Sequence, residues 1–307
     1  MSGLFTFGES MGVVAADGIG PLAHARTFSF GIGGAESNVA IGVARLGGEA
    51  TWLGRVGPDT TGALIARRLA DAGVRALAVP DTMFTGLMIR YQRSGEFMHV
   101  DYHRAGSAGS RLTPADVPAA ELREAGIVHV TGITPALSGT CRAAVFQSVE
   151  TALAAGVPVS LDVNYRSKLW SRLEAAAVLR DLVSMVDIVF AGPDEASLFV
   201  DDDHLGGLAK LGPTEVIIKD GGRGCVAQID GERYQVPALP VTVVDPVGAG
   251  DAFVAGYLAD RMAGATPDRC LATAIAAGAF AVTVPGDGEG LPDRAELAAL
   301  TGGDIRR

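Results

Sequence analysis

The feature of this 307-residue sequence that most constrains its fold is an alternation of short apolar runs with alanine-rich stretches. The stretches 39–46 and 62–72 have apolar residues at helical spacing, and a glycine follows each of them. Strand-like runs separated by helical stretches such as 141–155 then occupy 127–132, 157–163, 187–192 and 215–221. Because strands that alternate with helices pair in parallel, we predict an α/β fold in which helices cover both faces of a mostly parallel sheet.

Two segments depart from this alternation. Residues 84–104 hold two strand-like runs around Ser94-Gly95 with no helix between them, which predicts a hairpin with one wetter face. Residues 10–33 are also strand-like but are interrupted by glycines and a proline. We interpret both segments as strands of a small β-sheet, a lid, inserted into one domain that spans residues 1–307.

Composition excludes several classes of partner. No apolar run approaches the roughly 20 residues that a membrane-spanning helix needs. The net charge of −10, the 6% aromatic content and the lack of a basic block are unlike a nucleic-acid-binding surface. Cys141, Cys225 and Cys270 form no CxxC pair, which favours buried thiols over disulfides or a zinc site. We therefore expect a cytoplasmic protein that binds neither membrane nor nucleic acid.

The strongest chemical signal lies between residues 243 and 253, where an apolar run leads into the turn Asp245-Pro-Val-Gly248-Ala249-Gly250-Asp251 and then a helical stretch. Glycines at this position let successive backbone N–H groups point into one concavity at a helix N-terminus, where they bind anions and stabilise a transferring phosphoryl group. Asp251 stands at the mouth of this nest and could accept a hydroxyl proton. The plainer interpretation, that Asp251 only caps the helix, is open for an isolated Gly-Asp pair.

Two common nucleotide-binding motifs are absent from the sequence. No G-x-x-x-x-G-K-[ST] P-loop is present, which excludes a Walker-type NTPase. A dinucleotide site also fits poorly, because Phe253 stands where its third glycine belongs.

A second motif, Gly33-Gly34-Ala35-Glu36-Ser37-Asn38, precedes the first helical stretch. Gly33 and Gly34 allow close backbone approach, and Ser37 or Asn38 could simply cap the helix. Together with the Asp251 motif, however, we interpret this segment as part of a substrate site.

The run 245–253 resembles the C-terminal signature of the PfkB carbohydrate kinases, and residues 33–38 resemble their N-terminal motif. The resemblance implies a ribokinase-like three-layer α/β/α domain with a small β-sheet lid, and ATP with Mg²⁺ as cofactors. It makes Asp251 the catalytic base beside Gly248, Ala249 and Gly250. It also implies that Gly33, Gly34, Ala35 and Asn38 hold the substrate.

A narrower resemblance, to the 2-keto-3-deoxygluconate kinases of that family, covers nearly the whole chain through segments 102–110, 132–138, 161–170, 245–251 and 286–292. It implies ATP-dependent phosphorylation of the terminal hydroxyl of a sugar acid. The sugar acid is then bound by Tyr102, Arg104, Arg166, Asp251 and Asp287. The nucleotide residues that the resemblance implies are Asn164, Arg166, Lys219, Gly221, Gly222, Arg223, Gly224, Gly248 and Gly250.

The chain departs from the family pattern at two positions. Where the wider family often has N-x-x-E for its magnesium and phosphate network, this chain has Gly192-Pro193-Asp194-Glu195, so Glu195 remains as a metal candidate without its asparagine. Met88 occupies a lid position at which relatives carry a polar aromatic, which removes one hydroxyl contact.

The lid run also contains His99, Asp101 and His103 on one strand face. Alternate residues of a strand stand about 6.5 Å apart, so the two histidines are about 13 Å apart and cannot readily share one ion. We interpret this face as a solvent or dimer face. The exposed edges of a small sheet invite pairing, so we predict a homo-oligomer formed through the lid.

Other functions remain open on this scaffold. Ribokinase, fructokinase or a nucleoside kinase would share the motifs, and a sugar- or nucleotide-binding regulator would share the fold. A neutral sugar needs no arginine pair, so Arg104 and Arg166 favour an acid. A pure binder has no use for a base, so Asp251 favours an enzyme.

Overall fold

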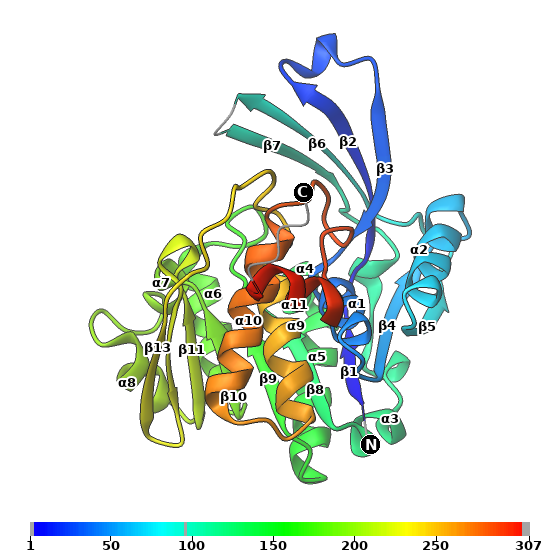
Figure 1. Ribbon diagram of the computed structural model, residues 1–307. Helices are drawn as coiled ribbons and strands as arrows, with labels where there is room; N and C mark the ends of the chain where they lie inside the picture. Colours follow the sequence, from blue (N-terminus) through cyan, green and yellow to red (C-terminus); the bar gives the residue numbers. More distant parts are fainter. Residues whose placement is uncertain (1–2, 95–96, 303–307) are drawn as a thin grey trace.

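In the computed structural model, which describes residues 3–94 and 97–302, the chain forms two β-sheets and a set of flanking helices (Figure 1). The strands are β1 (Leu4–Phe7), β2 (Met11–Ile19), β3 (Phe28–Gly33), β4 (Ala50–Val56), β5 (Arg75–Pro80), β6 (Leu87–Ser94), β7 (Phe97–His103), β8 (Ile127–Thr131), β9 (Val159–Asp162), β10 (Ile188–Ala191), β11 (Glu215–Lys219), β12 (Cys225–Ile229) and β13 (Glu232–Val236). The α-helices are α1 (Ala35–Arg45), α2 (Thr60–Asp71), α3 (Ala119–Glu124), α4 (Thr134–Leu137), α5 (Gly139–Ala154), α6 (Arg172–Val183), α7 (Pro193–Ala196), α8 (His204–Ala209), α9 (Ala249–Met262), α10 (Pro267–Ala281) and α11 (Arg294–Thr301).

The larger sheet has nine strands in the order β13-β12-β11-β10-β9-β8-β1-β4-β5. The pairs from β11 through to β5 are parallel, and the pairs β11–β12 and β12–β13 at one edge are antiparallel. The strand order reverses direction beside β1, because the chain moves outward to β4 and β5 and then returns to β8 on the other side of β1. The predicted mostly parallel sheet is therefore confirmed.

Helices cover both faces of this sheet because its central strands are apolar on both sides. Leu4 belongs to a core shared with α1, α2, α9 and α10, whereas its neighbour Phe5 belongs to a core shared with α5, α6 and α8. The same alternation separates Phe190 from Val189 on β10. The fold thus has the three layers that the sequence predicted.

Most element boundaries lie within a few residues of those expected. Helix α1 begins at Ala35, four residues before the predicted stretch, and ends at Arg45 ahead of Gly47, whose φ is +83°. Helix α2 likewise stops before Gly73, whose φ is +81°. The apolar run 241–244, which leads into the turn before Asp251, lies in a loop where Val243 and Val244 are exposed.

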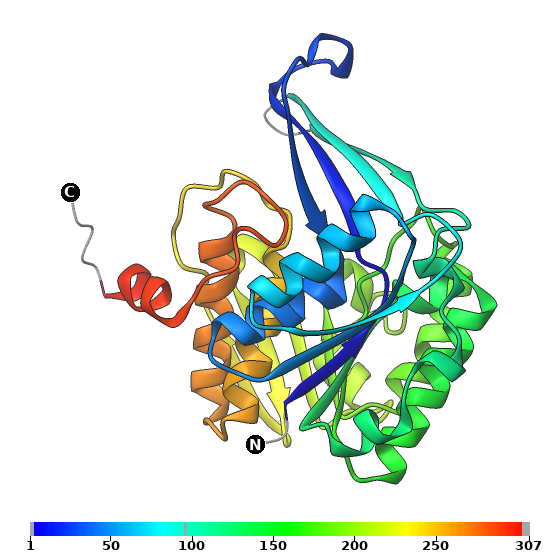
Figure 2. The ribbon, with the colours of Figure 1, turned by 90° about the vertical axis from the view of Figure 1, so that its right-hand side faces the viewer.

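The smaller sheet, which we call the lid sheet, consists of strands in the order β3-β2-β6-β7. It projects beyond the carboxyl ends of the parallel strands, as Figures 1 and 2 show. Strands β6 and β7 pair antiparallel as the predicted hairpin requires, although Gly95 in its turn lies outside the described residues. On one face, Met11, Val13 and Met88 form a small buried cluster.

All three cysteines are free and buried, as predicted. Among the helices in the described ranges, none is long and apolar enough to cross a bilayer.

Candidate active site

The predicted site residues converge at the carboxyl ends of the parallel strands, next to the lid sheet. Asp162 and Lys219 are the last residues of β9 and β11, and Glu9 follows β1. Asp251 lies in the first turn of α9, which reaches the same edge. Ligands of open α/β sheets bind at this edge, where the strand order reverses and loops diverge.

The turn before α9 has the geometry of an anion nest. Gly248 is the N-cap residue with φ +77°, a left-handed conformation that favours glycine. A Cβ atom there would also stand 2.5 Å from the carbonyl oxygen of Asp287. No side chain of the described residues caps α9, so the N–H groups of its first turn stay available at the positive end of a 14-residue helix.

A single asparagine joins the two carboxylates of the site. The Asn38 Nδ2 atom donates hydrogen bonds of 2.7 Å to Asp251 Oδ2 and of 2.7 Å to Asp287 Oδ1. Asn38 and Asp287 are buried, whereas Asp251 is partly open to solvent. Helix α1, the nest helix α9 and the loop after α10 are thereby fixed relative to one another at the reacting centre.

The two carboxyl groups do not ionise at their ordinary pH. Burial and the nearby charge of Asp287 raise the pKa of Asp251 to about 7, against the lowering effects of the Asn38 hydrogen bond and Arg166. Burial also raises the pKa of Asp287 to about 6, although Asn38 and Arg90 act in the opposite direction. A carboxylate whose pKa lies near neutrality is suited to accept a proton during catalysis.

The glycines of the N-terminal motif bring backbone close to these acids. A Cβ atom on Gly33 would stand 2.1 Å from Asp287 Oδ2 and 2.8 Å from Met88 Cε, so no larger residue fits between them. On Gly34 it would collide with the Glu9 carbonyl oxygen at 2.5 Å. Ala35 then begins α1 and is buried. The motif therefore lies beside Asp287 and the lid sheet.

A second charged cluster lies on the other side of the nest. Lys219 Nζ donates to both carboxylate oxygens of Asp162, at 2.8 and 2.7 Å, and a Cβ atom on Gly250 would stand 3.6 Å from that nitrogen. Burial alone would lower the pKa of Lys219, but the charges of Asp162 and Glu195 raise it above its usual range. Lys219 is therefore a charged ammonium at the edge of the nest.

Glu195 borders this cluster but is already engaged by backbone groups. Its Oε1 atom accepts the Tyr165 N–H at 2.9 Å, and its Oε2 atom accepts the Gly192 N–H at 2.7 Å. Burial and the charge of Asp162 raise its pKa. In this arrangement Glu195 holds the loop that follows β9, and a metal ion would have to compete for both oxygens.

That loop carries the two residues expected between substrate and nucleotide. Asn164 is buried with φ +40°, an uncommon conformation for a residue other than glycine and one that clusters at functional sites. Arg166 is exposed, and within the described part of the chain it forms no ion pair, because Asp162 pairs with Lys219 instead. Its guanidinium is thus available to a ligand.

Arg104, by contrast, is held by a buried acid that sequence reasoning did not single out. Arg104 Nε donates to Glu9 Oε2 at 2.7 Å, and Ser107 donates its hydroxyl to the other oxygen of Glu9. Arg104 lies one residue beyond β7 and its guanidinium is 5.5 Å from the ring centre of Tyr102. Glu9 fixes the direction of Arg104 and leaves part of its donor set for a ligand.

Lys168 is a second residue that the sequence analysis missed. Its Nζ atom donates to the Val100 carbonyl oxygen at 2.6 Å and lies 5.6 Å from the Tyr102 ring centre, so it connects the loop after β9 to the lid sheet. The sequence did contain a signal that could have identified Glu9 and Asp162 as site residues. Both occur where a parallel strand ends, and ligand sites form at that edge of such sheets.

The loop expected to bind nucleotide joins β11 to β12. Gly221 has φ +53°, and Cβ atoms added to Gly221 or Gly222 would meet no atom of the described residues within 4 Å, so the loop is open on that side. Gly224 has φ +99° and packs against the backbone of Val236. Arg223 is exposed and pairs with Asp220, its neighbour in the same turn.

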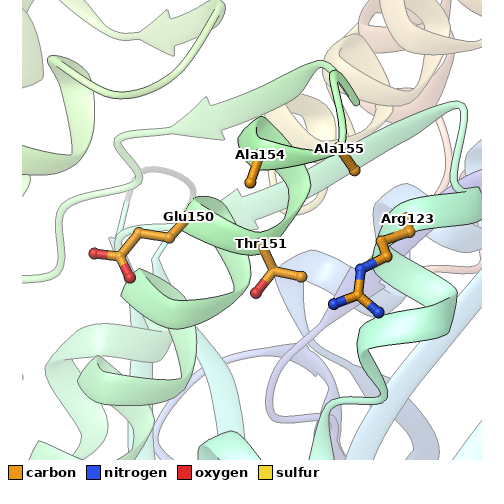
Figure 3. Close-up of a pocket in the computed structure, with 5 residues that line it drawn as sticks. All are labelled: Arg123, Glu150, Thr151, Ala154 and Ala155. Atoms are coloured by element: carbon orange, nitrogen blue, oxygen red, sulfur yellow. The ribbon is translucent and has the colours of Figure 1, made fainter.

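The lid-face histidines point away from these groups. His99 and Asp101 are about half exposed and lie 3.2 Å apart, and the His99 ring packs on Tyr91. A surface hollow elsewhere on the molecule is lined by Arg123, Glu150, Thr151, Ala154 and Ala155 (Figure 3). It borders the C-terminus of α5, which leads into the opposite end of the sheet, and contains none of the predicted site residues.

Comparison with known proteins agrees with this geometry. The family model described as pfkB family carbohydrate kinase matches residues 1–294. A 2-dehydro-3-deoxygluconokinase from Bacillus subtilis is 36% identical over 96% of this chain and 94% of its own length. A 2-dehydro-3-deoxygalactonokinase from Haloferax volcanii is 33% identical over 98% of this chain and 97% of its own length.

Solved structures of similar fold also match this chain over nearly its whole length. An Escherichia coli protein described as a putative ribokinase II in complex with ATP and Mg²⁺ superposes with a TM-score of 0.91 at 28% identity, covering 98% of this chain and 99% of that one. With its ribokinase-like three-layer fold, its small β-sheet and its match to the family model over residues 1–294, the chain belongs to the pfkB family of carbohydrate kinases.

Proposed function

We propose that the protein is a sugar-acid kinase that transfers the γ-phosphoryl group of ATP to the terminal hydroxyl of 2-keto-3-deoxygluconate. The observation that carries the proposal is the Asn38-linked pair Asp251 and Asp287 beside an uncapped helix N-terminus. A base with a pKa near 7 then adjoins a site for phosphoryl oxygens, as hydroxyl phosphorylation requires. The two relatives described above are named as kinases of deoxy sugar acids, and this narrows the proposed substrate from sugars in general to a deoxy sugar acid.

In the proposed reaction, Asp251 accepts the proton of the terminal hydroxyl as that oxygen attacks the γ-phosphorus. The bond between the γ-phosphorus and the β,γ-bridging oxygen breaks, and ADP leaves with its electron pair. The N–H groups at Gly248, Ala249 and Gly250 stabilise the charge on the transferring group. Lys219 adds a positive charge at the edge of the nest.

We assign Asn38 as a hydrogen-bond acceptor for a substrate hydroxyl. Its Oδ1 atom is buried and has no hydrogen-bond partner among the described residues. An unsatisfied buried acceptor is costly, and a hydroxyl bound beside Asp251 and Asp287 would satisfy it. Gly33 and Gly34 provide the close backbone approach that such a ligand needs.

The carboxylate of the substrate is assigned to Arg166 with help from Arg104. Arg166 has no carboxylate partner within the described residues, and the chain is strongly acidic, so an anionic substrate needs such a group. Arginine binds carboxylates through a planar fork that lysine cannot reproduce. Tyr102 stacks beside Arg104 at the lid edge of the same space.

ATP is proposed to lie along the open loop Gly221–Gly224, including Arg223, with its phosphates toward the nest and with Asn164 and Arg166 beside them. Mg²⁺ would supply charge neutralisation at the phosphates. Within the described ranges, no three acids, histidines or cysteines are grouped to hold a metal ion. We therefore expect Mg²⁺ to bind mainly phosphate and water, with Glu195 as the candidate acid.

We also propose that the protein is a cytoplasmic homo-oligomer formed through the lid sheet, with no membrane or nucleic-acid partner. Phe28 and Phe30 on β3 are 45% and 46% exposed, and a four-stranded sheet buries little apolar surface unaided. The proposed location in the cytoplasm is supported by the three free cysteines, since that compartment keeps thiols reduced, and by the proposed use of ATP.

A coupled ADP-release assay across sugar acids and neutral sugars tests the proposed function. We expect the highest kcat/KM with 2-keto-3-deoxygluconate or its C4 epimer, and much lower values with gluconate, fructose, ribose and nucleosides. Preference for fructose or ribose would make the chain a neutral-sugar kinase. ATP binding without ADP release on any sugar would favour a regulator.

A further inference from the structure

A buried ion pair connects the lid sheet to the nest. Arg90 on β6 places its Nη1 atom 3.0 Å from Asp245 Oδ2, and the two side chains are only 8% and 7% exposed. Arg90 lies on the same face of the lid sheet as Met88, which packs toward Gly33 and Asp287. This arginine therefore enters the core from the lid sheet, on the side of the active site.

Asp245 is the point where three segments meet. Its Oδ1 atom accepts the Val247 N–H at 3.1 Å and so shapes the turn directly before Gly248. Its Oδ2 atom accepts the Gly286 N–H at 3.1 Å and so fixes the loop directly before Asp287. One carboxylate thus holds the nest, the Asp287 loop and, through Arg90, the lid sheet.

The contact between Arg90 and Asp245 is electrostatic. Arg90 Nη1 forms no aligned hydrogen bond within the described residues, so the attraction to Asp245 offsets the cost of burying the guanidinium. The charge of Arg90 also lowers the pKa of Asp287, which places this guanidinium within electrostatic reach of the acid pair. Removing Arg90 would leave Asp245, Asp287 and Glu289 as buried or neighbouring acids without the cation supplied by the lid sheet.

We propose that Arg90 is a positioning residue that fastens the lid sheet to the nest, so that sugar binding under the lid sheet and alignment of the γ-phosphoryl group depend on one ion pair. Among the described residues, Arg90 has no hydrogen bond or ion pair to Asp251 or to the nest, so it acts through Asp245. The inference rests on the proposed kinase activity but not on the identity of the sugar, because the pair should matter equally for whichever sugar the enzyme phosphorylates.

The test replaces Arg90 with Met, which keeps the length of the side chain and removes the charge, in the full-length protein. A small misplacement of reacting groups can lower a rate by about 10²-fold, and we expect a loss of that order in kcat/KM for the sugar. KM for ATP should stay nearly unchanged. The ratio of ADP released to sugar phosphorylated should rise, because a loosened lid admits water to the site.

The matched control is Arg93→Met, an exposed arginine on the same strand, which should leave all of these quantities unchanged. A double-mutant cycle with Asp245→Asn adds a second readout. If the pair acts as a unit, the double variant should lose no more than the more damaged single variant. Arg90→Lys retains a charge and should recover part of the loss, and it replaces Arg90→Met if thermal unfolding shows that the latter is unfolded.

Three results would overturn the proposal. The first is wild-type kcat/KM and an unchanged ADP-to-product ratio in folded Arg90→Met. The second is equal damage to the KM values of sugar and ATP, which indicates general loss of structure. The third is full additivity of the Arg90 and Asp245 losses. If no sugar is phosphorylated by the wild-type protein, the proposed function fails instead, and the two failures are distinguishable.

Discussion

Replacing Asp251 with Asn should make the protein more stable while removing its activity. In the folded protein the pKa of Asp251 is raised to about 7, whereas an unfolded aspartate titrates near its ordinary value of about 3.9. Below about pH 4 both states hold the proton, so the group has no effect on stability. As pH rises toward 7 the unfolded state loses its proton first, and the free energy of unfolding falls.

The size of the effect follows from the shift. A change of about three pKa units at 1.36 kcal/mol each sets an upper bound of about 4 kcal/mol. Asp251 is partly open to solvent and shares Asn38 with Asp287, so we expect Asp251→Asn to raise the free energy of unfolding at pH 8 by about 1–2 kcal/mol. The gain should shrink toward zero near pH 4. Activity should fall by about 10²–10⁴-fold, the usual effect of losing a general base.

Urea unfolding at a series of pH values, with ADP release measured on the same preparations, checks both parts. Asp268→Asn is the matched control, because Asp268 is an exposed aspartate in the first turn of the adjacent helix α10. That variant should keep full activity and gain no stability. A less stable Asp251→Asn protein, a gain independent of pH, or turnover near the wild-type rate would refute the assignment of Asp251 as a base with a raised pKa.

Three further predictions concern pH, the substrate carboxylate and assembly. For the wild-type enzyme, kcat/KM should rise with pH through an apparent pKa near 7 as Asp251 loses its proton, and a profile that is flat between pH 5.5 and 8.5 would contradict this. Arg166→Lys should raise KM for the sugar acid far more than KM for ATP, and equal losses on acidic and neutral sugars would show that Arg166 does not read the carboxylate. Light scattering should show a homo-oligomer that Phe30→Ser weakens, whereas a wild-type monomer at working concentrations would exclude assembly through the lid sheet.

The sequence predicted the parts of the fold that depend on patterns of neighbouring residues. Apolar runs such as 187–192 are bounded by loops and become central strands, and Gly47 and Gly73 end helices because both adopt positive φ. The start of α1 was placed late because Glu36, Ser37 and Asn38 carry polar side chains that are buried by contacts from distant segments. Residues 241–244 were apolar but belong to an exposed loop, which a local pattern cannot distinguish from a strand.

The candidate site also contains both residues that the sequence predicted and contacts that only the structure revealed. Asp251 and its glycines were predictable because the nest is a contiguous turn, and the structure brings Asn38 and Asp287 to it. The ion pairs Glu9–Arg104 and Arg90–Asp245 join residues far apart in sequence, so only the tertiary fold reveals them. Arg104 is paired with Glu9, whereas Arg166 has no ion pair among the described residues, and this difference between the two arginines is also a tertiary feature.

The sharpest test of the account compares two substrates that differ only at the group assigned to Arg166. The wild-type enzyme is assayed with 2-keto-3-deoxygluconate and with 3-deoxyfructose, which has a hydroxymethyl group in place of the carboxylate, and the products are located by phosphorus NMR. The account predicts phosphorylation of the terminal hydroxyl and a preference for the acid of about 10²-fold or more, as expected when a site built to bind a polar group meets an analogue without it. Equal kcat/KM for the two compounds, or a phosphate at another position, would contradict the account.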